Sequence, residues 1–201
     1  MTPGPNPSPA RRADAARNRA KILAAARTAF AGSAAGSDSD THTEVSMAEI
    51  SRRAGVGMAT LYRNFPDRRE LLEALYTDEV DAICEATVTT AGETPGAVLI
   101  AWLHRFFAFS NSKRHIAAEL LTHGDSSNPV FGESRARVLD AGRPLLLAAQ
   151  RAGEIRRDLT LEQILDLIVA IARIRGAPSY LEPILQTALD GFSLPTDPEP
   201  T

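Results

Sequence analysis

The sequence predicts an all-α fold, and three observations carry that prediction. Helix-capping signals recur along the chain, as in Ser46 followed by Glu49 and Thr160 followed by Gln163. Apolar residues return at helical spacing, and no segment sustains the alternation of a half-buried strand. Hydrophobic residues make up 44% of the 201 positions, which is enough for one or two packed cores. We therefore expect a three-helix N-terminal domain followed by a larger helical domain.

The first helix is expected from about Asp14 to Ala31, with Ile22 and Phe30 on its buried stripe. Residues 1–13 are expected to be a disordered tail, because four prolines fall within the first ten positions. Residues 32–44 are rich in Gly, Ser and Asp and are predicted to form a loop.

Residues 45–72 hold the densest set of local signals in the chain. Gly55 can take the positive φ that ends a helix, so a helix-turn-helix is predicted around it. The expected helices run over Met47–Arg53, Met58–Asn64 and about Arg68–Thr87.

Side-chain caps mark the starts of the helices in this segment. Ser46 can cap the first turn while Glu49 reaches back to the Ser46 amide, which would complete a capping box. Asp67 and Glu70 repeat the arrangement before the longer helix. The helix-turn-helix domain is therefore predicted over residues 14–66.

Residues 67–192 are predicted to form the second domain, with the helix over 67–87 connecting the two and a disordered tail over 193–201. Caps, apolar spacing and glycine or proline stops predict further helices over about 97–110, 113–123, 129–152, 161–174 and 180–189. Pro144 is expected to strain or kink the third of these.

Composition excludes several classes of protein. The apolar runs are too short for a membrane span, and the proline-rich start does not resemble a signal peptide, so a cytoplasmic location is expected. Cys84 is the single cysteine, which rules out an internal disulfide and favours a small packed hydrophobe. The spacing of His104, His115 and His123 matches no common metal site.

Charge is unevenly distributed along the chain. Residues 1–70 hold 11 Lys and Arg against 7 Asp and Glu, a net charge of +4, whereas the whole chain carries −3. Such a split fits a basic head that faces phosphates and an acidic body that faces away from them, unless it is a chance imbalance.

A joint pattern of residues runs through positions 14–76. Its members are Ile22, Leu23, Ala25, Ala26, Phe30, Ile50, Ala54, Gly55, Val56, Thr60, Leu61, Tyr62, Phe65, Arg68, Leu71 and Leu72. With this pattern the segment resembles the TetR family of bacterial transcription regulators. It departs from the family in three ways, because Ser51 replaces an alanine, Gly57 replaces a Ser or Thr cap, and the 32–44 loop is longer than usual.

Residues 140–192 also resemble the C-terminal half of one branch of this family. The matching positions are Ala149, Ala152, Gly153, Arg156, Asp158 and Leu159. Together the two resemblances imply a DNA-binding regulator, by family tendency a repressor, that is released by a small-molecule effector bound in the C-terminal domain.

The second helix of a helix-turn-helix presents its N-terminal side chains to the major groove. Thr60 is expected at a base edge or phosphate, and Arg63 at guanine or simply at phosphate. The resemblance implies phosphate contacts for Tyr62 and Arg68. The predicted DNA-binding set is Arg17, Arg19, Thr43, Ser46, Met47, Met58, Ala59, Thr60, Tyr62, Arg63, Asn64 and Arg68.

One head contacts little DNA, so a homodimer on an approximately palindromic operator is expected. The predicted dimer contacts, unless they are intramolecular core, are Ile164, Leu167, Ile168, Ile171, Leu181, Ile184, Leu185 and Ala188. The resemblance places an effector pocket in the body, although core packing explains the same residues. They are Trp102, His104, Phe106, Phe107, Phe109, His115, Leu120 and Phe131.

Two other functions stay open at this point. One is a ligand-binding or catalytic helical protein whose helix-turn-helix is architectural, and the other is a nucleoid-type protein that coats DNA without sequence preference. Against catalysis, the chain lacks a glycine-rich phosphate loop and a nucleophile elbow, while His123, Asp125 and Ser126 are typical turn residues. We therefore expect that the protein is not an enzyme and that it binds no cofactor or metal. Its expected partners are double-stranded DNA, a small-molecule effector and a second copy of the chain.

Overall fold

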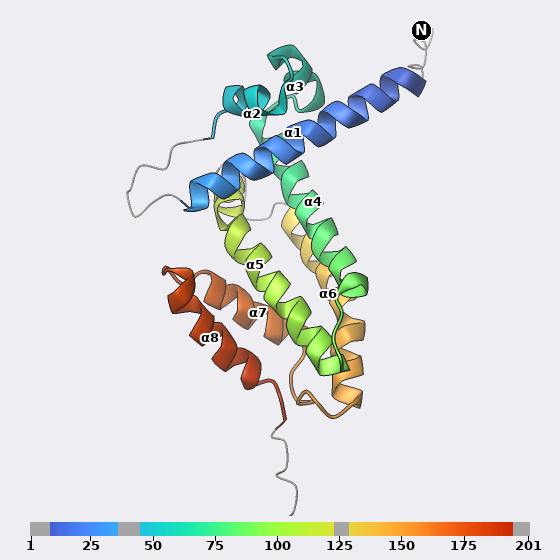
Figure 1. Cartoon of the computed structure of the whole chain (residues 1–201), viewed down its shortest axis with the longest axis vertical. Coiled ribbons are helices and arrows are strands. Elements are labelled where there is room, and N and C mark those ends of the chain that lie inside the picture. Colours follow the sequence, from blue (N-terminus) through green and yellow to red (C-terminus); the bar gives the residue numbers. More distant parts are fainter. Residues whose placement is uncertain (1–8, 36–44, 123–128, 195–201) are drawn as a thin grey trace, which may run out of the picture. The chain divides into compact units, whose positions relative to one another are not determined.

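The computed structural model describes residues 9–35, 45–122 and 129–194. Predictions that concern the remaining residues, namely Thr43, His123, Asp125, Ser126, most of the 32–44 loop and the ends of both tails, lie outside this range. The described helices, drawn in Figure 1, are α1 (Pro9–Ala35), α2 (Met47–Ala54), α3 (Met58–Asn64), α4 (Arg68–Thr89), α5 (Pro95–Thr122), α6 (Pro129–Arg151), α7 (Leu161–Ala172) and α8 (Pro178–Asp190).

The described residues contain no strand, and a single isolated bridge pairs Ile155 with Ser193. The all-α prediction is therefore confirmed. None of the helices that the structure describes is both long enough and apolar enough to cross a lipid bilayer.

The chain falls into two compact units. Unit 1 comprises residues 1–76 together with 115–123, and unit 2 comprises residues 77–114 together with 124–201. The first turns of α4 thus belong to unit 1, with the helix-turn-helix. The sequence had predicted that the second domain begins at residue 67. Leu71, Leu72 and Leu75 explain this grouping, because all three are buried in the core of unit 1.

In unit 1, α1 packs across α2 and α3 (Figure 1). The stripe predicted on α1 is buried, as Ile22 is fully covered and Phe30 is 8% exposed. The N-terminus of α1 differs from the prediction, because the helix starts at Pro9 rather than Asp14. Proline is well suited to a first helical position, and the alanines and arginines that follow it are good helix formers.

The caps of α2 and α4 form largely as predicted. The Ser46 hydroxyl accepts from the Glu49 amide at 3.2 Å, and the Asp67 carboxylate accepts from the Glu70 amide at 2.8 Å. Gly55 has a φ of 65°, the left-handed conformation that ends α2.

The second half of the predicted capping box at Ser46 is replaced by an ion pair. The Glu49 carboxylate accepts hydrogen bonds from Arg52 at 2.7 and 2.9 Å and from Arg53 at 2.6 Å. These two arginines, Arg52 first, hold the pKa of the Glu49 carboxyl at about 2, below its ordinary value of 4.5. A guanidinium one turn away is a stronger partner for a carboxylate than a neutral backbone amide is.

A predicted break between two helices is absent from the structure. Separate helices were expected over 97–110 and 113–123, but α5 runs without a break from Pro95 to Thr122. Asn111 and Ser112 are weak helix formers that each cost only about 0.5 kcal/mol. Continuing the helix buries Lys113, Ile116 and Leu120, and this tertiary packing outweighs the local preference.

In unit 2, Gly142 of α6 packs directly against Trp102 of α5. A Cβ at this position would lie 2.5 Å from Cη2 of Trp102, which is closer than real side-chain contacts allow. Trp102 is fully buried, and its indole N–H donates to the Ile83 carbonyl at 3.1 Å. The Trp102 ring therefore contacts both α4 and α6. Helix α6 itself continues through Pro144 without ending.

Helices α7 and α8 pack side by side (Figure 1). The capping box predicted at the start of α7 is complete, with Thr160 and Gln163 bonding to each other's backbone amides. Gly153 has a φ of 74°, which turns the chain after α6. Burial raises the pKa of the Cys84 thiol, as expected for a partly packed and unreactive cysteine.

Candidate nucleic-acid interface

Helix α3 presents the predicted recognition side chains to solvent. Met58 is 39% exposed and Tyr62 is 46% exposed, whereas Leu61 between them is fully buried. Ala59 and Arg63 are also exposed, and Thr60 is half-buried. Because one side of α3 packs into unit 1, the other side is free to enter a groove of DNA.

The polar groups of α3 are paired with one another. Arg63 donates to the Thr60 hydroxyl at 3.0 Å and to the Ala59 carbonyl at 3.2 Å. Asn64 donates to the Thr60 carbonyl at 2.8 Å. A base or phosphate would replace the Arg63 contacts at little cost, since they are exposed hydrogen bonds to the side chain's own helix.

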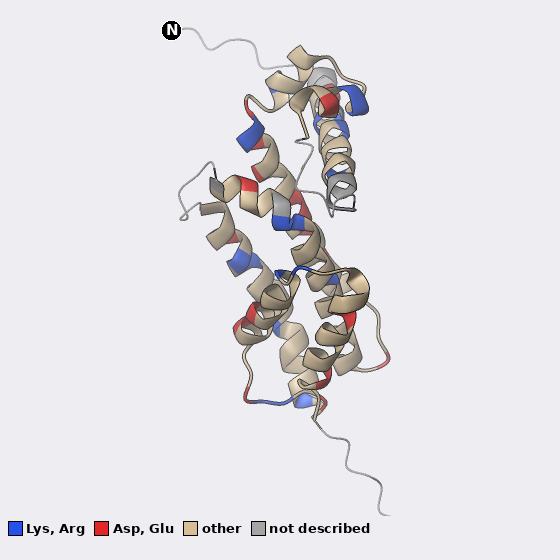
Figure 2. Cartoon of the chain, turned by 90° about the vertical axis from the view of Figure 1, so that its left-hand side faces the viewer, with Lys and Arg blue, Asp and Glu red and all other residues tan. Residues whose placement is uncertain are grey.

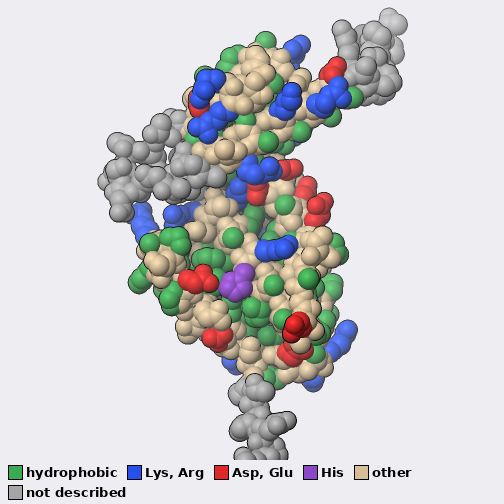
Figure 3. Space-filling model, viewed as in Figure 1, with side chains coloured by type: hydrophobic (Ala, Val, Ile, Leu, Met, Phe, Trp, Pro, Cys, Tyr) green, Lys and Arg blue, Asp and Glu red, His purple; other side chains and the backbone are tan. Residues whose placement is uncertain are grey.

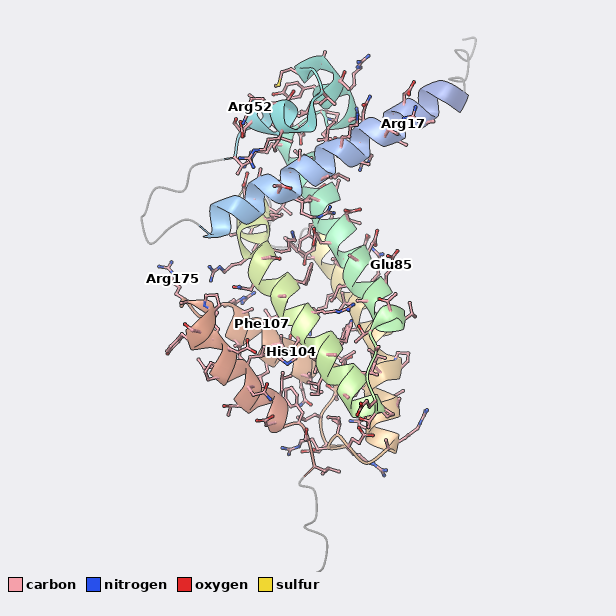
Figure 4. All side chains as sticks on the ribbon, viewed as in Figure 1. Arg17, Arg52, Glu85, His104, Phe107 and Arg175 are labelled. Carbon is pink, nitrogen blue, oxygen red and sulfur yellow. The ribbon has the colours of Figure 1, made fainter. Side chains whose placement is uncertain are left out.

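Two arginines of α1 lie on the surface of unit 1. Arg19 stacks over the Phe65 ring, 4.4 Å from its centroid, and reaches the Asn64 carbonyl at 3.5 Å. Arg17, labelled on α1 in Figure 4, is exposed and pairs with Asp14. An arginine held by an aromatic ring is preorganised for a phosphate, because less side-chain freedom is lost on binding.

Charge in α1, α2 and α3 is strongly positive. These helices hold nine Arg and Lys against two Asp and Glu, and Figure 2 shows basic residues predominating in them. Such a surface attracts the phosphate backbone before any base is read.

Arg68 takes part in contacts that its predicted role did not include. It donates to both carboxylate oxygens of Glu119 and to the Val45 carbonyl, with the Nη2–Oε2 distance at 2.9 Å. Its guanidinium carbon also lies 5.6 Å from the Phe30 ring centroid. The side chain is only 22% exposed, so a phosphate would have to compete for it.

Two further predicted DNA contacts lie at the start of α2 and differ in exposure. Ser46 is exposed, but its hydroxyl serves as the α2 cap, and Met47 is half-buried. Ser51, which replaces the alanine of the family pattern, is 4% exposed and donates to the Val56 carbonyl at 2.6 Å. This hydrogen bond stabilises the turn between α2 and α3. In the sequence, only the replacement of the family alanine by serine pointed to it.

Comparison with known proteins bears on the identity of this surface. Residues 43–75 match the family described as bacterial regulatory proteins, tetR family, and residues 94–193 match the transcriptional regulator SbtR-like C-terminal domain. A crystal structure of a TetR transcriptional regulator from Streptomyces coelicolor is 32% identical, with a TM-score of 0.69, and covers 89% of this chain and 99% of its own.

This chain belongs to the TetR family of bacterial transcription regulators.

Two further relatives agree with this membership. A TetR transcription regulatory protein from Mycobacterium vanbaalenii is 32% identical with a TM-score of 0.69, over 91% of this chain and 99% of its own. An uncharacterised HTH-type transcriptional regulator of Mycobacterium bovis is 26% identical over 76% of this chain and 79% of its own. The chain is a DNA-binding regulator, and the reading of its helix-turn-helix as merely architectural is not supported.

In this TetR-family chain, the residues predicted for the effector pocket are divided between the two units. Trp102 and Phe106 are packed in the core of unit 2, and Leu120 and His115 belong to unit 1. The side chain of His115 lies outside the described part of the structure. Leu120 is 1% exposed, so core packing accounts for it.

His104, Phe107, Phe109 and Phe131 are half-buried. Figure 3 shows a histidine at the surface of unit 2 among apolar side chains, where Figure 4 labels His104 and Phe107 on α5. The described residues contain no cluster of three or more His, Cys, Asp and Glu side chains suited to a metal ion.

The predicted dimer contacts also separate into two groups. Five of them have relative exposures of 4% or less and are intramolecular core, namely Ile164, Ile168, Ile171, Leu181 and Leu185. Their burial within the single chain fits the alternative of intramolecular core, because an apolar stripe looks alike whether it faces the chain's own core or a partner. Leu167 is 42% exposed, and Ile184 and Ala188 are half-buried.

An outer face of α7 and α8 contains Leu167 and continues to Ile174 and Tyr180, which are 37% and 60% exposed. A groove of about 320 Å³ lies on this face between the two helices. Its lining residues are Arg156, Leu159, Gln163, Ile164, Leu167, Thr187, Ala188, Gly191 and Phe192.

Proposed function

We propose that this TetR-family regulator binds an approximately palindromic operator as a homodimer and represses transcription until a small-molecule effector binds its C-terminal unit. The exposed face of α3 is the observation that carries the proposal. Tyr62 and Arg63 are accessible on it while Leu61 anchors the same helix in the core. A cytoplasmic location follows from this role, since the operator lies there.

Within this proposal, Thr60 and Arg63 read base edges and Tyr62 contacts phosphate. Arg63 has the paired donors that suit guanine, and its present partners lie on its own helix. Arg17 and Arg19 extend the phosphate contacts along the backbone. Arg19 is the better placed of the two, because Phe65 already orients its guanidinium.

The operator is tested by selecting duplexes from a random-sequence pool with the wild-type protein. An inverted repeat whose half-sites are spaced by about one helical turn is the expected product. The Thr60→Val and Arg63→Gln variants should change the selected bases. Uniform binding to all duplexes would support the nucleoid-type alternative and overturn the proposal.

We place the dimer interface on the outer face of α7 and α8. Leu167, Ile174 and Tyr180 supply exposed apolar area there, and Ala188 and Gly191 allow a partner helix to come close. A self-complementary face of this kind is what a two-fold interface requires.

Light scattering at micromolar concentration tests the interface. The Leu167→Glu variant buries a charge at the interface and should be monomeric, with greatly weakened operator binding. Val88→Glu is the matched control, because Val88 is 85% exposed at the end of α4 and should tolerate the same change. A Leu167→Glu variant that remains a dimer would move the interface elsewhere.

The proposed effector contact is Phe109, a half-buried aromatic residue of α5. Phe109 lies 6.0 Å from Phe106, which in turn stacks on Trp102 at 6.0 Å, measured between ring centroids. Since Trp102 is the single tryptophan, its fluorescence reports on this aromatic row. Candidate ligands that change Trp102 emission and also release the operator are the expected effectors, and Phe109→Ala should abolish both responses.

A further inference from the structure

Arg68 joins four helices of unit 1 through one guanidinium. It is the first residue of α4 and donates to Glu119 of α5 and to the Val45 carbonyl just before α2. Its third neighbour is the Phe30 ring near the end of α1. The ion pair spans 51 positions of sequence, and both side chains are 22% exposed.

The contact with Glu119 uses the paired donors of the guanidinium. Nε and Nη2 face the two carboxylate oxygens, the same parallel geometry that arginine adopts with a phosphate. A phosphate cannot use this edge of Arg68 while Glu119 holds it. The negative charge of Glu119 also cancels the attraction that Arg68 would exert on DNA.

The position of this carboxylate relative to the head is equally informative. Arg68 begins α4 next to the capping residue Asp67, where the partial positive charge of a helix N-terminus favours an anion. The resemblance to the TetR family implies that a DNA phosphate contacts Arg68 at this helix N-terminus, in addition to the contacts of the proposed function. Glu119 uses the same donors of Arg68 that such a phosphate would need.

Glu119 is carried by a helix that belongs to both units. Residues 115–123 group with unit 1 and residues 95–114 with unit 2, although α5 is one continuous helix. Phe109 precedes Glu119 by ten residues, which is about 15 Å along a helix axis. Because α5 is one continuous helix, we expect a shift at its aromatic residues to reach Glu119.

We propose that Glu119 is an internal phosphate mimic that competes with operator DNA for Arg68, so that the position of α5 sets the DNA affinity of the head. The proposal rests on the proposed function and deepens it, since it names the contact through which the head is regulated. When α5 presents Glu119, Arg68 is withheld from the operator. When α5 withdraws Glu119, Arg68 gains a phosphate.

The test compares three full-length variants with the wild type by fluorescence anisotropy on the duplex that the wild type selects. Glu119→Gln frees Arg68 and should bind at least threefold more tightly, with a salt slope steeper by about 0.9 for each subunit. Glu73→Gln is the matched control, because it removes the same charge from the neighbouring Arg69–Glu73 pair. It should leave the salt slope unchanged. Glu119→Gln combined with Arg68→Ala should lose the whole gain.

A second measurement uses the unaltered protein. The Nε–H resonance of Arg68, assigned with Arg68→Lys in arginine-labelled protein, should shift when operator DNA is added, because its acceptor changes from carboxylate to phosphate. An unshifted resonance in the DNA complex would overturn the proposal, even if Glu119→Gln did not fold.

The outcomes separate this inference from the proposed function. If the wild type selects a palindrome but Glu119→Gln and Glu73→Gln bind it with equal affinity, the proposal of a phosphate mimic is refuted and the proposed function stands. The Arg68–Glu119 ion pair would then have a structural role only. If the wild type selects no sequence from the pool, the proposed function fails and the phosphate mimic fails with it.

Discussion

Removing a single oxygen from Tyr62 should separate DNA recognition from folding. Tyr62 is 46% exposed on α3, so Tyr62→Phe takes away one solvent-facing hydroxyl and no core contact. The free energy of unfolding should stay within about 0.5 kcal/mol of the wild type, as is usual for surface substitutions. Operator affinity should fall, because the proposed phosphate contact is lost.

The size of the loss follows from the chemistry of the contact. A hydrogen bond to a charged acceptor contributes about 1.5 kcal/mol, and a homodimer loses two of them. The expected total is about 3 kcal/mol, or roughly a hundredfold in dissociation constant. The salt slope should not change, since a neutral hydroxyl releases no counterion from DNA.

Anisotropy titrations between about 50 and 200 mM salt, together with thermal unfolding, measure both quantities. Leu61→Ala is the opposite control on the same helix, because Leu61 is fully buried and its truncation should destabilise unit 1 by about 2 to 5 kcal/mol. Operator affinity of Tyr62→Phe equal to that of the wild type would refute the proposed docking of α3.

Three further predictions concern stability. Gly142→Ala places a methyl group 2.5 Å from Trp102. The overpacking costs about 1 to 3 kcal/mol, which should exceed the gain of about 1 kcal/mol in helix propensity. Calorimetry should therefore show a lower melting temperature, and the fluorescence of Trp102 should change. Ser51→Ala removes the bond to the Val56 carbonyl and should cost about 1 kcal/mol in urea unfolding, with weaker operator binding because the turn before α3 loosens. The pKa of Glu49 is lowered from 4.5 to about 2, so its ion pair stabilises the fold above about pH 4.5 and loses this effect as the pH falls toward 2. The stabilities of the wild type and of Glu49→Gln, measured by unfolding at each pH, should therefore converge over that window.

Much of the head could be predicted from the sequence, because its signals are local. The bounds of α3, Met58–Asn64, and the left-handed turn at Gly55 both match the prediction. Caps act between residues three positions apart, as Asp67 and Glu70 do, so neighbouring letters suffice to recognise them. The family membership likewise follows from a pattern contained in a short segment.

The body depended on contacts that local patterns do not encode. An apolar stripe on α7 predicted burial correctly, but only the packing decided that Ile168 faces the chain's own core and that Leu167 faces solvent. The unbroken course of α5 arose in the same way, since buried Ile116 and Leu120 outweigh the weak propensities of Asn111 and Ser112.

By itself, the sequence determined the helical class, the helix-turn-helix and its outward-facing recognition helix, because each depends on periodicity and capping within a few residues. The tertiary structure alone decided which stripe of a helix is covered and which partner Arg68 has. The Glu119 carboxylate lies 51 positions away from Arg68, and only the folded chain brings the two charges together.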